Sequence, residues 1–183
     1  MRGYFGIGVE GISKPMNLGS LMRTAHAFGA SFIFTIGAAF DVRNTRLADT
    51  SAADSSLPLH DYPDLDAFTL PRGCQLVGLE FREDAIEMPS FRHPARAAYV
   101  LGAERDDLSP GLIERCDHVV RIPTQFCINV ALAGALVMYD RMISLGRFAE
   151  RPVRSGGPAS PLPPHRHGMP PWKKKRGTVE TSS

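Results

Sequence analysis

Short runs of hydrophobic residues alternate with amphipathic stretches through the first 150 residues of the chain. Each run is a few residues long and is bounded by glycine, proline or charged residues, which is typical of strands buried in a parallel sheet. The runs are Tyr4–Val9, Ser31–Ile36, Gln75–Leu79, Ala98–Leu101 and His118–Ile122. The pattern therefore predicts a mostly parallel sheet.

The stretches between these runs carry hydrophobic residues at helical spacing. One set, at steps of three and four, comprises Leu18, Leu21, Met22, Ala25 and Phe28. It predicts an amphipathic helix over Asn17–Phe28, with Asn17 near the N-cap and Gly29 as the stop signal. Shorter helices are predicted over Leu65–Phe68 and Pro110–Arg115.

The last predicted helix, Ile128–Leu145, is apolar on almost every side, so we expect it to be buried. Ser, Asp, Ala and Thr are frequent between Phe40 and Pro63, which predicts a long functional loop with at most a short helix or strand. Strands that alternate with helices indicate an α/β fold, with a mostly parallel sheet flanked by helices.

The charge pattern divides the chain into a body and a tail. The 183 residues are 43% hydrophobic, which suffices for one domain with a full core. Residues 151–183 hold seven lysines and arginines against one acidic residue, with many prolines and the single tryptophan, Trp172. We predict a domain over residues 1–150 and a disordered, Pro-rich basic tail over 151–183. The tail either contacts nucleic-acid phosphates and stacks a base, or is solvated without a defined partner.

Composition also argues against several classes of protein. No hydrophobic run reaches eighteen residues and the N-terminus lacks the features of a signal peptide, so we expect a cytoplasmic protein that does not enter a membrane. Cys74, Cys116 and Cys127 form no CxxC pair, so neither a disulfide framework nor a metal site is predicted. The N-terminal glycines form no GxGxxG fingerprint, which argues against a dinucleotide cofactor.

Polar residues follow several of the predicted strands, at the end where parallel sheets bind ligands. Asn17 and Arg23 lie six residues apart, almost two turns, on the helix after the first strand. Glu104 follows the strand Ala98–Leu101, and Asn129 stands at the start of the last helix. Taken singly, Arg23 would be a surface residue, Glu104 a solvated loop residue and Asn129 a helix cap.

Three segments, taken in order, resemble the three motifs of the SpoU-type (TrmH-like) RNA 2′-O-methyltransferases of the SPOUT superfamily. The segments are NLGSLMRTAHAFGA, YVLGAERDDLS and RIPTQFCINVALAGALVMYDR, and the resemblance extends over residues 4–147. It implies an α/β fold whose C-terminal segment forms a trefoil knot, a rare exception to unknotted topology. It also implies a homodimer and S-adenosyl-L-methionine (AdoMet) as the cofactor.

The resemblance implies roles for individual residues. It makes Arg23 the catalytic arginine, and it matches Asn17, Glu104 and Asn129 to the polar residues of the first, second and third motifs. The implied cofactor-binding residues are Leu79, Gly102, Ile122, Cys127 and Ile128. No metal ligand is implied.

Three features depart from the family pattern, all of them in the second and third motifs. Where relatives often have Ser-Leu-Asn-Val-Ser, this chain has Cys127-Ile-Asn-Val-Ala131, so one hydroxyl becomes a thiol and another is absent. The loop between Pro123 and Cys127 is shorter than in many relatives, and Asp107 replaces a usual glycine. A nucleophilic role for Cys127 is disfavoured, because no neighbouring basic residue favours the thiolate.

The chemistry of methyl transfer explains why an arginine is needed. A ribose 2′-hydroxyl is weakly acidic, so the negative charge that develops on its oxygen must be stabilised. A guanidinium is always protonated, and we therefore expect Arg23 to act by electrostatics and orientation while the proton passes to an RNA phosphate or water. Glu104 would fix Arg23 through a charge-assisted pair, with Asn17 and Asn129 as a polar floor.

The sequence thus predicts an AdoMet-dependent RNA ribose 2′-O-methyltransferase that acts as a homodimer. Because no separate N-terminal RNA-binding domain precedes the motifs, tRNA is favoured over rRNA as the substrate. Two alternatives stay open. One is a non-catalytic RNA-binding knotted relative that has lost the cofactor, which AdoMet titration would identify. The other is methyl transfer to a base atom, which leaves the product sensitive to alkaline cleavage.

Overall fold

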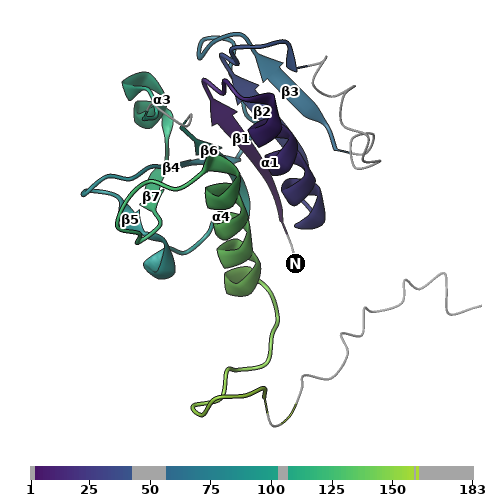
Figure 1. The fold of residues 1–183 in the computed structure, drawn as a ribbon, viewed down its shortest axis with the longest axis vertical. Coiled ribbons are helices and arrows are strands. Elements are labelled where there is room, and N and C mark those ends of the chain that lie inside the picture. Colours follow the sequence, from purple (N-terminus) through teal and green to yellow (C-terminus); the bar gives the residue numbers. More distant parts are fainter. Residues whose placement is uncertain (1–2, 43–56, 103–106, 159, 161–183) are drawn as a thin grey trace, which may run out of the picture. The chain divides into compact units, whose positions relative to one another are not determined.

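The central element of the structure, a computed structural model, is a parallel β-sheet. The structure describes residues 3–42, 57–102, 107–158 and 160, and Met1–Gly146 form one compact unit. The strands in the described part are β1 (Tyr4–Glu10), β2 (Phe32–Ile36), β3 (Leu59–Tyr62), β4 (Gln75–Leu79), β5 (Ile86–Glu87), β6 (Arg96–Leu101) and β7 (His118–Arg121). They form one sheet in the order β3-β2-β1-β6-β4-β7-β5, and each neighbouring pair is parallel. The predicted α/β class is confirmed (Figure 1).

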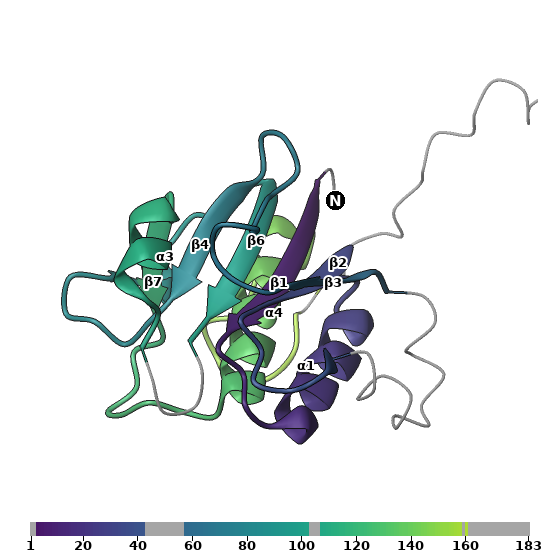
Figure 2. The same cartoon turned by 90° about the horizontal axis from the view of Figure 1, so that it is seen from above.

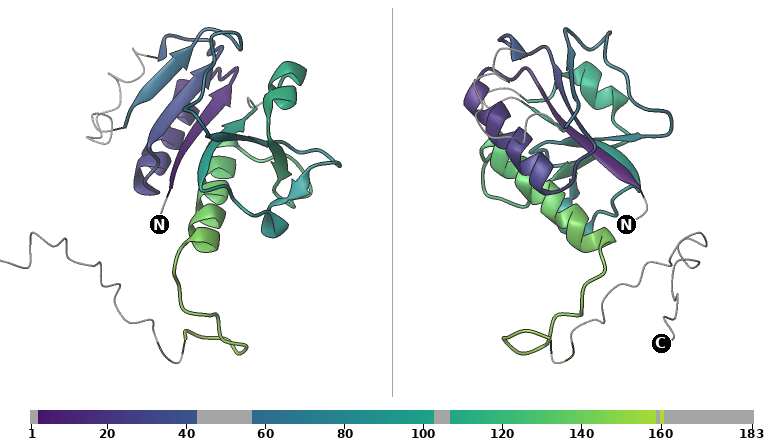
Figure 3. Two further views of the ribbon diagram at one scale, coloured as in Figure 1. Left: turned by 180° about the vertical axis from the view of Figure 1, so that it is seen from behind. Right: turned by 90° about the vertical axis from the view of Figure 1, so that its right-hand side faces the viewer.

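Helices cover both faces of this sheet. They are α1 (Pro15–Ala27), α3 (Pro110–Arg115) and α4 (Val130–Leu145), with a 3₁₀ turn, η2 (Met88–Ser90). α1 and α4 lie side by side on one face, and α3 lies on the other (Figures 2 and 3). The alternation of side chains along β6 separates two cores, because Tyr99 and Leu101 face the α1 and α4 side while Ala98 and Val100 face the α3 side.

The predicted strands are confirmed, with ends that differ by at most two residues. β3 lies inside the predicted loop Phe40–Pro63, which allowed for one short element, and residues 43–56 of that loop lie outside the described part. β5 escaped prediction because its two residues are both exposed, so it has no hydrophobic pattern.

Two glycines of β1 have a packing role. A Cβ atom on Gly6 would overlap the ring of Phe32, and one on Gly8 would overlap the ring and carbonyl oxygen of Phe34. Both aromatic residues belong to β2, the neighbouring strand. The N-terminal glycines thus make room for aromatic side chains that lie across β1.

The start of α1 differs from the prediction. Asn17 is not the N-cap, because the helix begins at Pro15 and its N-cap is Lys14, which makes no side-chain capping bond. Proline suits the first helical position, since its missing N–H would have no partner there. The predicted stop is confirmed: Gly29 adopts φ 74°, and its N–H donates to the carbonyl of His26 at 3.0 Å.

The short helix predicted over Leu65–Phe68 is wrong, because this segment forms only a turn. The Asp64 carboxylate accepts a hydrogen bond from the N–H of Ala67 at 2.8 Å, and the N–H of Phe68 donates to the carbonyl of Leu65 at 3.2 Å. The chain then turns away, and Phe68 packs against Phe34 in the core under α3. Four residues are too few for hydrophobic spacing to distinguish a turn from a helix.

α4 also differs from its prediction, because it is not buried on every side. Leu132, Leu136 and Tyr139 are 61%, 40% and 45% exposed, and they share one face of the helix. Arg141, a charged residue, is in contrast only 1% exposed. α4 therefore has two apolar faces. One packs on α1 and the sheet, and the other, with Leu132, Leu136 and Tyr139, is exposed.

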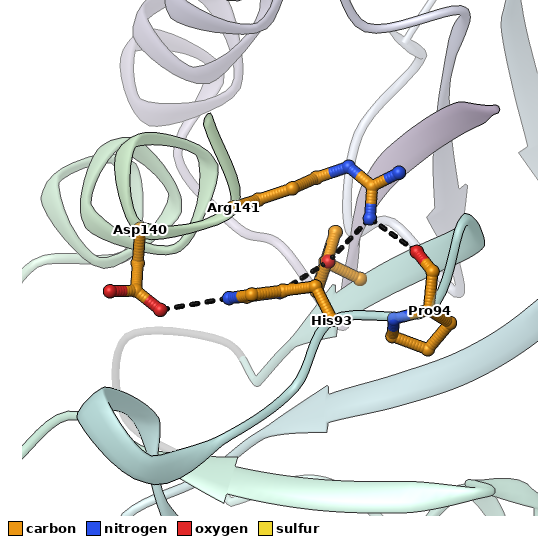
Figure 4. Close-up of polar contacts among 5 residues, drawn as sticks. His93, Pro94, Asp140 and Arg141 are labelled. Carbon is orange, nitrogen blue, oxygen red and sulfur yellow. Dashed lines mark hydrogen bonds and ion pairs between the residues drawn. The ribbon is translucent and has the colours of Figure 1, made fainter. Parts of the chain in front are cut away.

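Arg141 is buried because its guanidinium is hydrogen-bonded. It donates to the backbone carbonyl of Pro94 at 2.6 Å (Figure 4) and to the Tyr99 hydroxyl at 3.1 Å. It also donates to the backbone carbonyl of Ala95 at 2.9 Å and lies over the Phe5 ring. These contacts tie the end of α4 to the starts of β1 and β6. A charge without them would be costly in this core.

The Tyr99 hydroxyl continues this network to a buried histidine. Its oxygen lies 2.6 Å from His93 Nδ1, and His93 Nε2 lies 2.8 Å from the Asp140 carboxylate (Figure 4). Because the Tyr99 oxygen accepts from Arg141, its proton points to His93 Nδ1, so the neutral ring carries its proton on Nε2. Burial lowers the pKa of His93 and raises the pKa of Tyr99 to about 12.

The second compact unit comprises Arg147–Ser183. Its described residues, 147–158 and 160, form no helix or strand. The predicted disorder of the tail falls mainly on residues outside the described part. None of the helices described is long and apolar enough to cross a membrane.

Candidate active site

The carboxyl ends of four neighbouring strands meet at one edge of the sheet. Val9 of β1 pairs with Leu101 of β6, Leu101 pairs with Leu79 of β4, and Leu79 pairs with Val120 of β7. The segments that follow these strands therefore begin side by side. This is the edge at which open parallel sheets bind their ligands.

The N-termini of α1 and α4 face this same edge, since each helix runs back along the sheet. The Asn129 side-chain amide nitrogen donates to the side-chain oxygen of Asn17, Oδ1, at 3.3 Å, which joins two residues 112 positions apart in the sequence. The structure thus brings together the asparagines of the first and third motifs.

Asn129 also caps α4, as its residue type predicts. Its side-chain oxygen accepts hydrogen bonds from the N–H groups of Ala131 at 2.9 Å and Leu132 at 3.4 Å. The amide nitrogen therefore remains for Asn17. One side chain satisfies free backbone groups of the helix and also orients a second polar residue at the edge.

Arg23 lies further along α1 and is exposed. It is six residues beyond Asn17, about 9 Å along the helix axis at 1.5 Å per residue. No hydrogen bond or ion pair joins its guanidinium to another described residue. Within a single chain, the structure does not bring Arg23 to the Asn17–Asn129 pair. Glu104, its predicted partner, lies outside the described residues.

The predicted cofactor residues occupy three of the strand ends. Leu79 is the last residue of β4 and is 7% exposed, and Gly102 directly follows β6. Ile122 and Ile128 are half-buried against the core, at the two ends of the segment between β7 and α4. Cys127, next to Ile128, is exposed.

Two carboxylates at this edge were not singled out from the sequence. The oxygens of Glu80 accept hydrogen bonds from the N–H groups of Phe81 at 2.9 Å and Leu108 at 2.7 Å. Those of Glu10 accept from the N–H and the hydroxyl of Ser109, at 2.7 and 2.6 Å. The available signal was position alone, because Glu10 directly follows the predicted strand Tyr4–Val9 and Glu80 directly follows the predicted strand Gln75–Leu79.

The fold and this edge define an α/β protein of the class that binds its ligand at the carboxyl ends of parallel strands. The model of the SpoU rRNA methylase family matches residues 5–139. The chain belongs to this family.

One curated relative is a tRNA (guanosine(18)-2′-O)-methyltransferase, TARBP1, of Mus musculus. It is 30% identical over 138 residues, which cover 70% of this chain and 9% of the relative. A TrmH-family tRNA/rRNA methyltransferase of Staphylococcus haemolyticus is 26% identical over 149 residues, 72% of this chain and 55% of the relative. The chain thus spans little more than half of one of these relatives and a small part of the other.

Solved structures share the fold. An AdoMet-bound rRNA methyltransferase from Sinorhizobium meliloti superposes with a TM-score of 0.69 at 21% identity, covering 79% of this chain and 58% of that one. This chain therefore has the same α/β fold as a protein of known structure.

Proposed function

We propose that this protein is an AdoMet-dependent RNA methyltransferase that transfers a methyl group to a ribose 2′-hydroxyl. The observation that carries the proposal is the Asn17–Asn129 hydrogen bond at the carboxyl edge of the sheet, in a member of the SpoU family. This contact joins the first and third motifs, and the predicted cofactor residues Leu79 and Gly102 stand at the ends of β4 and β6.

The residues at this edge fit AdoMet. Leu79, Ile122 and Ile128 offer apolar side chains for an adenine ring, and Gly102 allows close approach to its backbone. When bound, AdoMet supplies the methyl group from a sulfonium centre. The thiol of Cys127 stands where many relatives have a hydroxyl, and it is a weaker hydrogen-bond donor.

The role proposed for Arg23 is to stabilise the charge that develops on the 2′-oxygen. Its exposed guanidinium is free of bonds to other described residues, so it is available to an RNA. Asn17 and Asn129 orient polar groups at the carboxyl edge of the sheet, and Glu104 is proposed to hold the guanidinium. The proton leaves to an RNA phosphate or to water.

The proposed substrate is tRNA. The murine relative is named as a tRNA methyltransferase. A further solved structure, described by the 2-OH methylation of C/U34 on tRNA, superposes with a TM-score of 0.64 at 20% identity, covering 78% of this chain and 91% of that one. The alternative is rRNA, which the family description names.

The experiment that tests the activity is nucleoside mass spectrometry after incubation of the protein with labelled AdoMet and either tRNA or rRNA. We expect one 2′-O-methylated nucleoside from tRNA, at a linkage that resists alkaline cleavage. A labelled but alkali-sensitive product would indicate base methylation, and an unmodified RNA with no AdoMet binding in calorimetry would indicate the non-catalytic alternative.

We also propose the knot and the dimer that the family implies. β7 lies second from the sheet edge, yet the following helix α4 packs against α1 and β6, so the chain passes back across the sheet, as a threaded C-terminal segment would. Gly134 supports close packing there, since a Cβ atom would overlap Leu21 of α1. The exposed apolar face of α4 is the proposed dimer contact.

A further inference from the structure

Two carboxylates reach the same short piece of backbone from opposite sides of β6. Glu10 ends β1, Glu80 follows β4, and β6 lies between these two strands in the sheet. Their side chains bind the adjacent residues Ser109 and Leu108. Leu108 and Ser109 are therefore hydrogen-bonded to residues at the ends of both strands that flank β6.

The hydrogen bonds of Glu80 use both oxygens of its carboxylate. Glu80 is only 9% exposed, and each of its two oxygens accepts from one backbone N–H, those of Phe81 and Leu108. Both donors are fixed parts of the main chain. The position therefore needs two acceptor oxygens, one for each N–H. A carboxylate has two, whereas a carboxamide has one acceptor oxygen and an NH₂ group that only donates.

The hydrogen bonds of Glu10 are chemically different, because one of the two donors is the Ser109 hydroxyl, which can also act as an acceptor. Glu10 accepts from the Ser109 N–H and from the Ser109 hydroxyl, and the Ser109 oxygen also caps α3 by accepting from the Leu112 N–H at 3.3 Å. A hydroxyl can accept as well as donate. A glutamine at this position could accept from the N–H and donate to the hydroxyl.

We infer that Glu10 and Glu80 form a carboxylate clamp that positions the cofactor edge for methyl transfer, by holding Leu108 and Ser109 against the ends of β1 and β4. Leu79 directly precedes Glu80, and Gly102 follows β6 between the two clamped strands. The clamp thereby ties the backbone of Leu108 and Ser109 to the two strands that flank β6, directly after the predicted AdoMet contact Leu79 in the case of Glu80, before the cofactor binds. The inference rests on the proposed function.

The bonding pattern predicts different outcomes for the same chemical change. Glu80→Gln leaves one N–H without an acceptor, so we expect AdoMet affinity to fall about tenfold or more by calorimetry. Glu10→Gln can retain both bonds, so we expect an affinity within about twofold of wild type, whereas Glu10→Ala should lose affinity as Glu80→Gln does. Glu83→Gln, an exposed residue of the same loop, is the matched control.

Two further readouts separate positioning from loss of the fold. Hydrogen exchange of the free protein should be faster at the Leu108 amide in Glu80→Gln, while amides in the middle of β1 and β6 stay protected. At saturating AdoMet, Glu80→Gln should approach the wild-type kcat while its KM for AdoMet is raised.

The outcomes distinguish the clamp from the proposed function. If the wild type binds AdoMet but Glu80→Gln binds it equally well, or if Glu10→Gln is as weak as Glu10→Ala, the clamp is overturned. If the wild type binds no AdoMet, the proposed function fails and the positioning role fails with it.

Discussion

At the scale of single residues, the site depends on side chains with more than one hydrogen-bonding task. The Asn129 oxygen caps α4 while its amide nitrogen binds Asn17. Both tasks follow from one amide, but only the second requires nitrogen. Substitutions that change one end of the side chain therefore separate stability from activity.

For Asn129→Asp we expect nearly unchanged stability and a large loss of methyl transfer. The aspartate keeps the capping oxygen and favours the helix N-terminus electrostatically, but it cannot donate to Asn17. Asn129→Ala should lose activity and also about 1 kcal/mol of unfolding free energy. Urea denaturation and a methyl-transfer assay measure the two effects, and full activity of Asn129→Asp would contradict the proposed role of the Asn17 contact.

Arg23→Lys tests the geometry of the proposed catalytic residue. Lysine keeps the positive charge but loses the planar fork, so we expect turnover to fall by about 10²-fold while AdoMet affinity is unchanged. Single-turnover assays and calorimetry provide the two values, with Arg92→Lys as an exposed control. Equal turnover of Arg23→Lys would exclude a specific role for the guanidinium.

His93 makes the stability of the fold depend on pH. Its folded-state pKa is lowered by burial from the ordinary 6.5, so the unfolded chain binds the proton first as the pH falls. The groups around the ring are Tyr99, Asp140 and Arg141. The contribution of neutral His93 to the free energy of unfolding is complete above about pH 6.5. It decreases as the pH falls from there toward the lowered pKa of His93.

We therefore expect His93→Asn to lose less stability between pH 7 and 5 than the wild type does. It should nevertheless be less stable at pH 7, because contacts in the core are lost. Urea titrations at several pH values measure both effects, with His60→Asn, an exposed histidine, as the control. Parallel pH profiles for His93→Asn and the wild type would contradict the assignment.

At the scale of elements, most predictions succeeded where the pattern is local and repeated. The strand Gln75–Leu79, the helix Pro110–Arg115 and the stop at Gly29 were confirmed. Each is signalled by a few neighbouring residues: a buried hydrophobic run, a proline at the first helical position and a glycine that can adopt a positive φ, respectively. The Leu65–Phe68 helix failed because the segment is too short. The full burial of α4 failed because hydrophobicity does not say what covers each face.

The exposed face of α4 leads to a prediction at this scale. If Leu132, Leu136 and Tyr139 form the dimer contact, Leu136→Asp should place an unpaired charge in it and shift the protein to monomers. Sedimentation velocity measures the change, and Val153→Asp, at an exposed residue of the second unit, should not alter the assembly. A Leu136→Asp variant that stays dimeric would place the contact elsewhere.

At the scale of the whole molecule, the body and the tail have opposite charge. Residues 1–150 hold fourteen basic and eighteen acidic residues, whereas residues 151–183 hold the seven basic residues noted above. An RNA-binding protein with an acidic body needs local positive charge to contact phosphates. The tail is the densest source of it along the chain.

Truncation after Glu150 should therefore weaken RNA binding and reduce its dependence on salt. Each lost phosphate contact lowers the slope of log K against log salt by roughly 0.7 to 0.9. Fluorescence anisotropy with tRNA over a range of salt concentrations measures the slope, and AdoMet affinity provides the control. An unchanged slope would show that the tail makes no phosphate contacts.

The sequence by itself determined the five hydrophobic strands, the cap at Asn129 and the three motifs of the family, because each of these depends on residues close together in the chain. Only the tertiary structure decided which distant groups meet. Asn17 and Asn129 touch, Arg141 is buried, and Glu10 and Glu80 hold the same backbone, because the strand order places their elements side by side. No local spacing encodes that order, since contacts across a parallel sheet join residues far apart in the sequence.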